Sequence, residues 1–166
     1  MGLGVASLYN AFGGKHALFT RCLDRYLDGH MRARILHLEA TLPPRAALEA
    51  FLREVVERSA CDRRGCLLMN TALEFAPHDR GIGRVVAQRL AELEGFFRRA
   101  LQAGQADGSI HAGLDAEEAA PLLLTTVIGL RVLARARPDR RLMEAASRQA
   151  LARLDPPPVA TRRHNA

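Results

Sequence analysis

Several residue types are scarce in this chain, and their scarcity limits what the protein can be. There is no tryptophan, and Lys15 is the only lysine. The three cysteines, Cys22, Cys61 and Cys66, lack the spacing of a metal site or a disulfide framework, so we expect free thiols in a reducing compartment. The charge-free stretches are too short for a membrane span, and no signal-peptide pattern is present. These absences predict a cytoplasmic protein with no membrane association, no metal and no cofactor.

Catalytic patterns are also missing from the sequence. No Ser-His-Asp order, paired-carboxylate constellation or phosphate-binding glycine loop occurs, and the pair Gly13-Gly14 is too short to form such a loop. His78 follows Pro77 and fits the start of a helix better than a metal ligand or a base. We therefore expect that the protein is not an enzyme.

Arginine and apolar residues are plentiful instead. Apolar residues make up 48% of the 166 positions, enough for the core of one well-developed domain. The net charge is +6, from 24 basic and 18 acidic residues, and basic residues outnumber acidic ones by five to two in 1–38 and by seven to two in 131–153. Two basic regions are compatible with nucleic-acid binding, but a generally arginine-rich surface would look the same. The run of arginines from Arg131 to Arg141 is most simply a solvated or salt-bridged rim.

Apolar residues recur every three or four positions along most of the chain, which is the period of an amphipathic helix. Glycine and proline residues mark the breaks between the periodic segments. No strand pattern and no internal repeat is present, so the predicted fold class is all-α. Residues 155–166, which contain three consecutive prolines, are expected to be a disordered tail. The predicted helices span residues 4–12, 15–39, 45–60, 66–75, 79–104, 115–136 and 140–154.

The stretch from Val5 to Phe19 carries the sharpest motif. Leu8 and Phe12 share one face of a short helix, Gly13 suits a left-handed helix end, and Lys15 opens the next helix. The sequence Ala6-Ser-Leu-Tyr-Asn-Ala-Phe-Gly-Gly-Lys15 resembles the end of the helix-turn-helix of the tetracycline-repressor (TetR/AcrR) family of bacterial transcription regulators. The segment from Gly65 to Glu74 and the order of the later helices are also similar to that family. The resemblance implies a TetR-like helical bundle.

By this resemblance, helix 4–12 is the recognition helix of a DNA-binding motif. Tyr9, Asn10 and Lys15 match positions that contact DNA phosphates, and Val5 and Ser7 match positions that face the base edges. Lys15 at a helix N-terminus suits a phosphate on chemical grounds too, because its ammonium and the helix dipole attract the same anion. Alternatively, Tyr9 is a half-buried aromatic and Lys15 a solvated surface charge.

The first two helices of that family's DNA-binding motif do not occur in this sequence. Residues 1–40 are therefore expected to be a remnant of the helix-turn-helix domain, either through a misassigned start or through truncation. Leu8 and Phe12 would normally pack onto the absent helices, and so short a helix is marginal alone. We expect residues 41–154 to fold as a C-terminal ligand-binding and dimerisation domain, and operator DNA to be bound tightly only by a full-length form.

The resemblance also implies a pocket for an unidentified small-molecule effector. Polar residues within the most apolar predicted helix, 66–75, are candidates to line it, because buried polar groups need partners. The equally weighted alternative is that Asn70 and Glu74 bond to neighbouring helices or face solvent. For Cys66 we prefer the interpretation as an inert buried thiol to that as a redox sensor. The candidate pocket residues are Phe51, Cys66, Met69, Asn70, Leu73, Glu74, Phe97 and Thr126.

The last two predicted helices correspond to the dimer surface of that family, where they pair with their copies as a four-helix bundle. Small and apolar residues on them are the candidate contacts, namely Ala119, Leu123, Leu130, Ala146 and Ala150. The function predicted from the sequence is a homodimeric, ligand-responsive, DNA-binding transcription regulator, usually a repressor. The alternative is a dimeric ligand-binding or interaction module without DNA binding.

Overall fold

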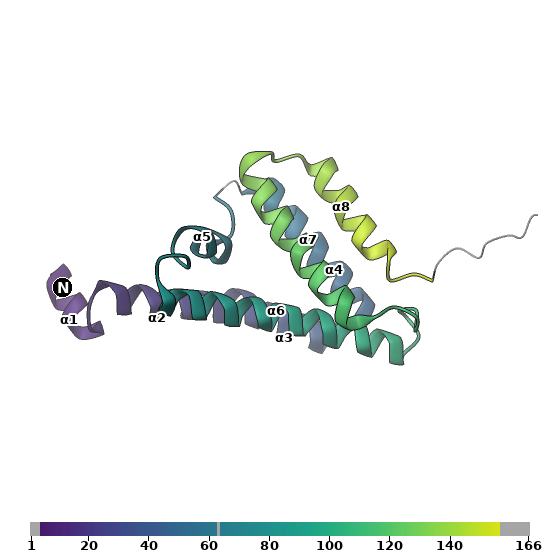
Figure 1. The fold of residues 1–166 in the computed structure, drawn as a ribbon, viewed down its shortest axis with the longest axis horizontal. Coiled ribbons are helices and arrows are strands. Elements are labelled where there is room, and N and C mark those ends of the chain that lie inside the picture. The colour runs from purple at the N-terminus through teal and green to yellow at the C-terminus, as the bar shows by residue number, and fades with distance from the viewer. Residues whose placement is uncertain (1–3, 63, 157–166) are drawn as a thin grey trace, which may run out of the picture.

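The computed structural model describes residues 4–62 and 64–156, and all regular structure within these ranges is helical (Figure 1). This confirms the all-α prediction. The predicted tail lies largely outside the described residues. The elements are α1 (Val5–Phe12), α2 (Lys15–Leu27), the π-helical segment η1 (Asp28–Arg32), α3 (Ala33–Thr41), α4 (Pro44–Cys61), α5 (Leu67–Glu74), α6 (Arg80–Ala106), α7 (Ala116–Ala136) and α8 (Arg140–Ala152).

Helix α1 ends where the sequence predicted. Gly13 has a φ of 80°, in the left-handed region, and its N–H donates to the Asn10 carbonyl. Gly14, with a φ of 111°, then turns the chain into α2, which begins at Lys15. Figure 1 shows α1 at one end of the molecule, beyond the N-terminal end of α2 and far from α7 and α8.

Residues 15–41 form one continuous helical path, as predicted, but its middle is a π-helical segment rather than an α-helix. The buried side chains Leu23, Leu27, Ile35 and Leu38 lie along this path. Twelve residues separate Leu23 from Ile35, which in an unbroken α-helix leaves them roughly a third of a turn apart around the axis. The wider turn of η1 absorbs this difference, so both halves of the path bury their apolar side chains against the same body.

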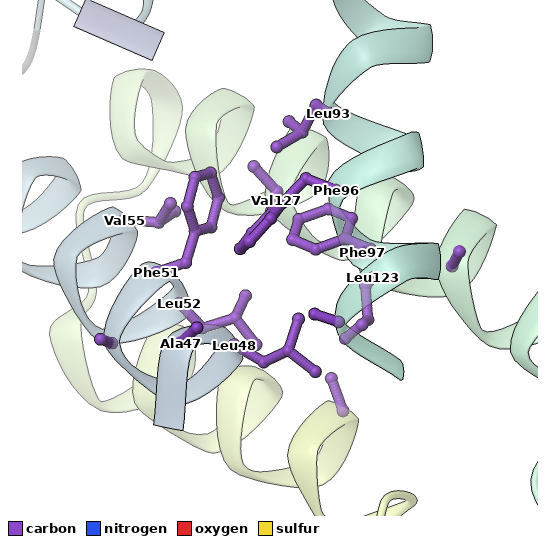
Figure 2. Close-up of a cluster of buried hydrophobic side chains, with 14 of the residues drawn as sticks. Ala47, Leu48, Phe51, Leu52, Val55, Leu93, Phe96, Phe97, Leu123 and Val127 are labelled. Atoms are coloured by element: carbon purple, nitrogen blue, oxygen red, sulfur yellow. The ribbon is translucent and has the colours of Figure 1, made fainter. Parts of the chain in front are cut away.

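The main core lies between α4, α6 and α7, with α3 and α8 closing its sides (Figure 2). Phe51, Phe96 and Phe97 meet at its centre, with ring centroids 5.3 to 5.5 Å apart. Phe96 and Phe97 are completely buried, and Leu48, Leu52 and Leu123 pack around them. This contact of aromatic and aliphatic side chains fixes α4 against α6 and α7.

A second, smaller cluster joins α2 to α5 and α6 through Leu23, Leu27, Leu68, Ile82 and Val86. Beside it, the buried guanidinium of Arg89 on α6 bonds to carboxylates on the long N-terminal helix. Its Nη2 lies 3.1 Å from Asp24 Oδ1, and its Nη1 lies 2.8 Å from Asp28 Oδ1. The segment that carries α1 is therefore held to α6 by both apolar and ionic contacts.

Aspartates begin three of the helices. The Asp79 side chain accepts hydrogen bonds from the N–H groups of Gly81 and Ile82, and the Asp115 side chain accepts from Glu117 and Glu118. Asp139 does the same for α8. The helix starts predicted at 79 and 115 are thus both confirmed to within one residue, because α6 begins at Arg80 after the Asp79 cap and α7 begins at Ala116 after the Asp115 cap.

The C-terminal end of the described chain is anchored. Leu154 is buried, and Asp155 forms an ion pair with Arg45 at 2.7 Å, so the ordered structure extends into the start of the predicted tail. By length and composition, α7 is apolar enough to cross a membrane. In this fold, however, its apolar side packs against α4 and α6, as the core helix of a globular bundle does.

Candidate ligand cavity and nucleic-acid interface

A cavity of about 310 Å³ lies between the long N-terminal helical path and helices α4 to α7. Its size falls within the range of small-molecule sites. Its lining combines an apolar interior with a polar and charged side. The apolar part consists of Leu27, Met31, Phe51, Val55, Leu68, Met69, Leu93, Val127 and Ile128, and the polar and charged part includes Tyr26, His30, Arg34, Glu54, Arg58, Asp62 and Arg131.

Arginines already engage both carboxylates of the lining. Glu54 forms ion pairs with Arg34 of α3 and, at 2.8 Å, with Arg58 of its own helix. Asp62 lies 2.9 Å from Arg64, whose hydrogen bonds hold the pKa of the Asp62 carboxyl below its usual value. Both carboxylates therefore already have an arginine at ion-pair distance, and they attract Arg131 only from farther away.

Arg131 of α7 is a further cation in the cavity lining. Its side chain is half-buried, and its Nη1 lies 3.4 Å from the hydroxyl oxygen of the buried Ser59. Within residues 4–62 and 64–156, no carboxylate lies in ion-pair distance of the Arg131 guanidinium. Burial lowers the pKa of Arg131, because desolvation disfavours the charged form; the neighbouring Arg58 acts in the same direction, whereas Cys66, Glu54 and Tyr26 act against it without reversing the shift. The expectation that Arg131 belongs to a solvated or salt-bridged rim was wrong.

Three of the eight predicted pocket residues, Phe51, Cys66 and Met69, line this cavity. Phe97 does not, because it is fully buried in the core beside Phe51 (Figure 2). Leu73 is 62% exposed on the outer face of α5, so it cannot form a wall.

The polar residues predicted for the pocket also lie outside its lining. The Asn70 Oδ1 accepts a hydrogen bond of 2.8 Å from Arg135 Nη1, and Glu74 lies 3.7 Å from the same arginine. These contacts dock α5 onto α7, which is the structural alternative considered for both residues. Thr126 is in a separate groove between α7 and α8, and its hydroxyl donates to the Leu122 carbonyl.

The five residues predicted to contact DNA lie together on α1 and at the first residue of α2. Val5, Ser7, Asn10 and Lys15 are exposed, and Tyr9 is half-buried. No described residue of α1 is buried, and Leu8, on its apolar face, is 40% exposed.

The C-terminal end of α1 is partly covered. Phe12 is half-buried, and the guanidinium of Arg21 lies 5.6 Å from the centre of its ring. His16 of α2 bonds to Asp79 at the start of α6, at 2.5 Å. The helix-turn segment is thus tied to the body near its base, while α1 itself extends into solvent.

A groove between α7 and α8 exposes another apolar surface, lined by Leu122, Thr126, Gly129, Leu130, Leu133, Ala146, Gln149, Ala150 and Arg153. Of the predicted dimer contacts, only Ala146 is exposed. Ala119 and Leu123 are buried within the subunit's own core, and Leu130 and Ala150 are buried at the base of the groove. The sequence prediction selected residues on the inward face of these helices, because apolar periodicity identifies the face that packs in the subunit's own core.

Residues 44–150 match the family described as "Tetracyclin repressor-like, C-terminal domain". The chain belongs to the TetR family. A curated relative from Bacillus subtilis (strain 168), "Uncharacterized HTH-type transcriptional regulator YezE", is 28% identical over 113 residues, which cover 67% of this chain and 58% of the relative. The match thus spans less than two thirds of that regulator's length.

Two solved structures of the TetR family regulator CifR are similar to this chain. One, a cysteine mutant complexed with 26 bp double-strand operator DNA and apo-CifR, is 34% identical with a TM-score of 0.77, covering 90% of this chain and 79% of that one. The other, a second cysteine mutant complexed with operator DNA of the same length, is 33% identical with a TM-score of 0.79, covering 92% and 81%. These likenesses confirm the TetR-like fold predicted from the opening motif.

Sequence reasoning missed the charged side of the cavity. Arg34, Glu54 and Arg58 come from two helices, and no local pattern distinguishes them from the many exposed arginines and glutamates of this chain. The inward position of Arg131 could have been predicted, because Arg131 lies four residues after Val127 and therefore on the same face of the helix. No group of three or more potential metal ligands occurs among the described residues.

Proposed function

We propose that this chain is part of a cytoplasmic, ligand-responsive, DNA-binding transcription regulator of the repressor type. The observation that carries the proposal is the family match over residues 44–150, together with an exposed helix-turn segment at the N-terminal end. CifR, which shares the fold, is solved on operator DNA. The protein itself acts by binding, and we assign it no catalytic step.

In this proposal α1 enters the major groove. Its exposed small residues, Val5 and Ser7, let the helix approach the base edges closely, and Tyr9, Asn10 and Lys15 contact the phosphates. Lys15 is the first residue of α2, so its ammonium group and the free N–H groups of that helix end attract one phosphate together.

Two copies would present two such helices. The apolar groove between α7 and α8 is the proposed dimer contact. In an isologous two-fold dimer, this face of one subunit packs against the same face of the other. The exposed residues Leu122, Ala146 and Gln149 and the half-buried residues Thr126 and Leu133 replace most of the contacts predicted from the sequence.

A ligand in the central cavity would act through the long helical path. Tyr26, His30, Met31 and Arg34 line the cavity from α2, η1 and α3, and α1 lies directly before the start of that path. A ligand that binds two arrangements of the path unequally shifts the population between DNA-competent and incompetent dimers.

The test is binding to the DNA upstream of the protein's own coding region, measured by fluorescence anisotropy from about 50 to 200 mM salt, with a scrambled duplex as control. We expect the protein's own upstream DNA to bind more tightly, with an affinity that falls steeply as salt rises. Lys15→Ala should lower the log–log salt slope by about 1, because one phosphate contact is lost. Equal binding to both duplexes would contradict the proposal.

A second candidate function is a dimeric ligand-binding module without DNA binding. The uncovered apolar face of α1, where Leu8 is 40% exposed, favours it, because a recognition helix needs packing partners to hold its orientation. Dimerisation with ligand binding, but with no DNA affinity at low salt, is the result that would select this second function.

A further inference from the structure

We propose that the central cavity binds an amphipathic organic monocarboxylate, with Arg131 as the group that holds the carboxylate. The inference rests on the proposed ligand-binding function and names the chemical class of the ligand. It depends on the charges of the cavity, the place of Arg131 in it and the apolar surface beside it.

The cavity has an excess of positive charge. Its lining carries three guanidinium groups, Arg34, Arg58 and Arg131, and two carboxylates, Glu54 and Asp62. Glu54 is shared by two of these arginines, and Asp62 pairs with Arg64 outside the lining. With Arg64 included, four guanidinium groups face two carboxylates, so two positive charges are in excess; one is shared by Arg34 and Arg58 around Glu54, and the other is on Arg131, which has no ion pair of its own in the described chain. A ligand carboxylate would neutralise Arg131.

That guanidinium has one weak hydrogen-bond partner in the described chain. Arg131 Nη1 donates to Ser59 Oγ at 3.4 Å, and a guanidinium has five N–H donors in total. Arg131 is partly withdrawn from water by the helices around it, so its remaining donors lie in surroundings where an ionic hydrogen bond is strong. A planar guanidinium fits a carboxylate in a bidentate geometry.

The ligand's body should be apolar, because apolar side chains form much of the cavity lining. Val127 lies one turn before Arg131 on the same face of α7, and Phe51, Val55 and Leu93 continue the wall. Polar groups of the lining also come near Arg131, namely Tyr26 from the N-terminal path and Glu54 and Arg58 from α4, so the carboxylate end of the ligand lies on this charged side and the apolar body against the wall. A strongly polar ligand would place polar groups against this wall, and the second charge of a phosphate would have to compete with Glu54 for Arg34 and Arg58, so both are disfavoured.

The experiment compares ligands that share a skeleton and differ in charge, on each of two skeletons. Octanoate and 4-phenylbutanoate are each tested beside the primary amide and the alkylammonium ion of the same skeleton, and octyl phosphate serves as a dianionic probe. Binding is measured by thermal shift and by calorimetric titration on the full 166-residue chain. We expect the carboxylates to raise the melting temperature and to bind at least about tenfold more tightly than the amides, ammonium ions and phosphate.

Variants of the arginine locate the site. Arg131→Gln should weaken carboxylate binding roughly ten- to hundredfold, because an ionic hydrogen-bonded contact is lost, while amide binding stays the same. Arg131→Lys should keep part of the preference for carboxylates. The matched control is Arg148→Gln, which removes the same charge from an exposed position on α8 and should change neither affinity. The melting temperature of each variant without ligand reports whether it has folded.

A spectroscopic measurement separates ion pairing from general attraction. With octanoate labelled with carbon-13 at the carboxyl carbon, the carboxyl pKa of the bound ligand should lie below that of the free ligand in the unchanged protein and return toward it in Arg131→Gln. Equal binding of amides and carboxylates, no carboxylate binding, or an undiminished affinity in Arg131→Gln would overturn the inference. None of these readouts involves DNA, so failure of the proposed regulator function would appear separately, in the operator-binding test.

Discussion

The ionic cluster around Arg89 should stabilise the attachment of the N-terminal helical path to α6. The Arg89 side chain is 7% exposed, and its guanidinium contacts Asp24, Asp28 and Glu92 at 3.1, 2.8 and 3.0 Å. The three carboxylates remain 26 to 48% exposed, so each pair is worth more than a surface pair but less than a fully buried one. At ~0.5–1 kcal/mol for each pair, the cluster contributes roughly 1.5–3 kcal/mol before the desolvation of Arg89 is subtracted.

The perturbation is Arg89→Met, which keeps an apolar stem in place of the arginine methylenes and removes the charge. We expect a loss of about 1–2 kcal/mol in the free energy of unfolding, equivalent to a melting temperature lower by roughly 2–8 °C for a chain of this size. Urea unfolding followed by circular dichroism measures the free energy, at low salt and again at about 1 M sodium chloride, where the loss should be smaller because the exposed carboxylates are screened.

The control is Arg84→Met, which makes the same change at an exposed position of the same helix. The double variant Arg89→Met/Glu92→Gln should be less destabilised than the sum of its single changes, by about 0.5 kcal/mol or more, because the two side chains share one contact. Additive effects within ~0.3 kcal/mol, or equal stability of Arg89→Met and Arg84→Met, would refute the reasoning.

Four further outcomes follow from packing, capping, titration and assembly. Gly104→Ala should destabilise the protein by ~1–3 kcal/mol in urea unfolding, because a Cβ at this site would lie 2.5 Å from Ile110 Cδ1; unchanged stability would mean that Ile110 moves aside freely. Asp115→Ala should cost about 1 kcal/mol through loss of the α7 cap, and Asp115→Asn much less. The pKa of the Asp79 carboxyl is lowered from 3.8, first by the backbone N–H of Ile82 and then by His16. The stability that the Asp79 carboxylate adds to the fold is therefore complete above pH 3.8 and is lost as the pH falls through the lower pKa of the folded state. The difference in melting temperature between wild type and Asp79→Asn should vanish below that lower pKa. Ala146→Glu should shift the protein from dimer to monomer in analytical ultracentrifugation, whereas Arg148→Gln should not, and a dimeric Ala146→Glu protein would exclude the α7–α8 groove as the interface.

Most of the fold could be predicted from the sequence, because helical periodicity and helix-ending residues are local signals. Gly13 as a left-handed helix end and Asp115 as a cap follow from their own chemistry and that of a few neighbours. The boundaries of the helices were accordingly close to those observed. The π-helical segment was not predicted, because it relates the burial of Leu23 in the smaller cluster to that of Ile35 in the main core, and no short window of sequence shows that both are buried.

The cavity could be predicted only in part. Phe51, Cys66 and Met69 were identified because they are apolar or buried residues in the central helices. Leu73 was misplaced, because an apolar residue in a short apolar helix gives no sign of which side faces outward. Burial of an arginine depends on helices distant in sequence, as with Ser59 beside Arg131, so the charged side of the cavity could not be read from composition.

The π-helical segment Asp28–Arg32 lets the N-terminal path hold one residue more than a regular α-helix would, without changing the direction in which α1 points. Removing one residue there, such as Gly29, would place Leu23 eleven positions before Ile35, about three full turns of a regular α-helix. Leu23 and Leu27 would then keep their places against α5 and α6 without any π-helical turn. A regular α-helix with the present number of residues would instead turn everything before the segment by roughly a third of a turn, so the irregular turn, and not the surface chemistry of α1, sets where that helix is aimed.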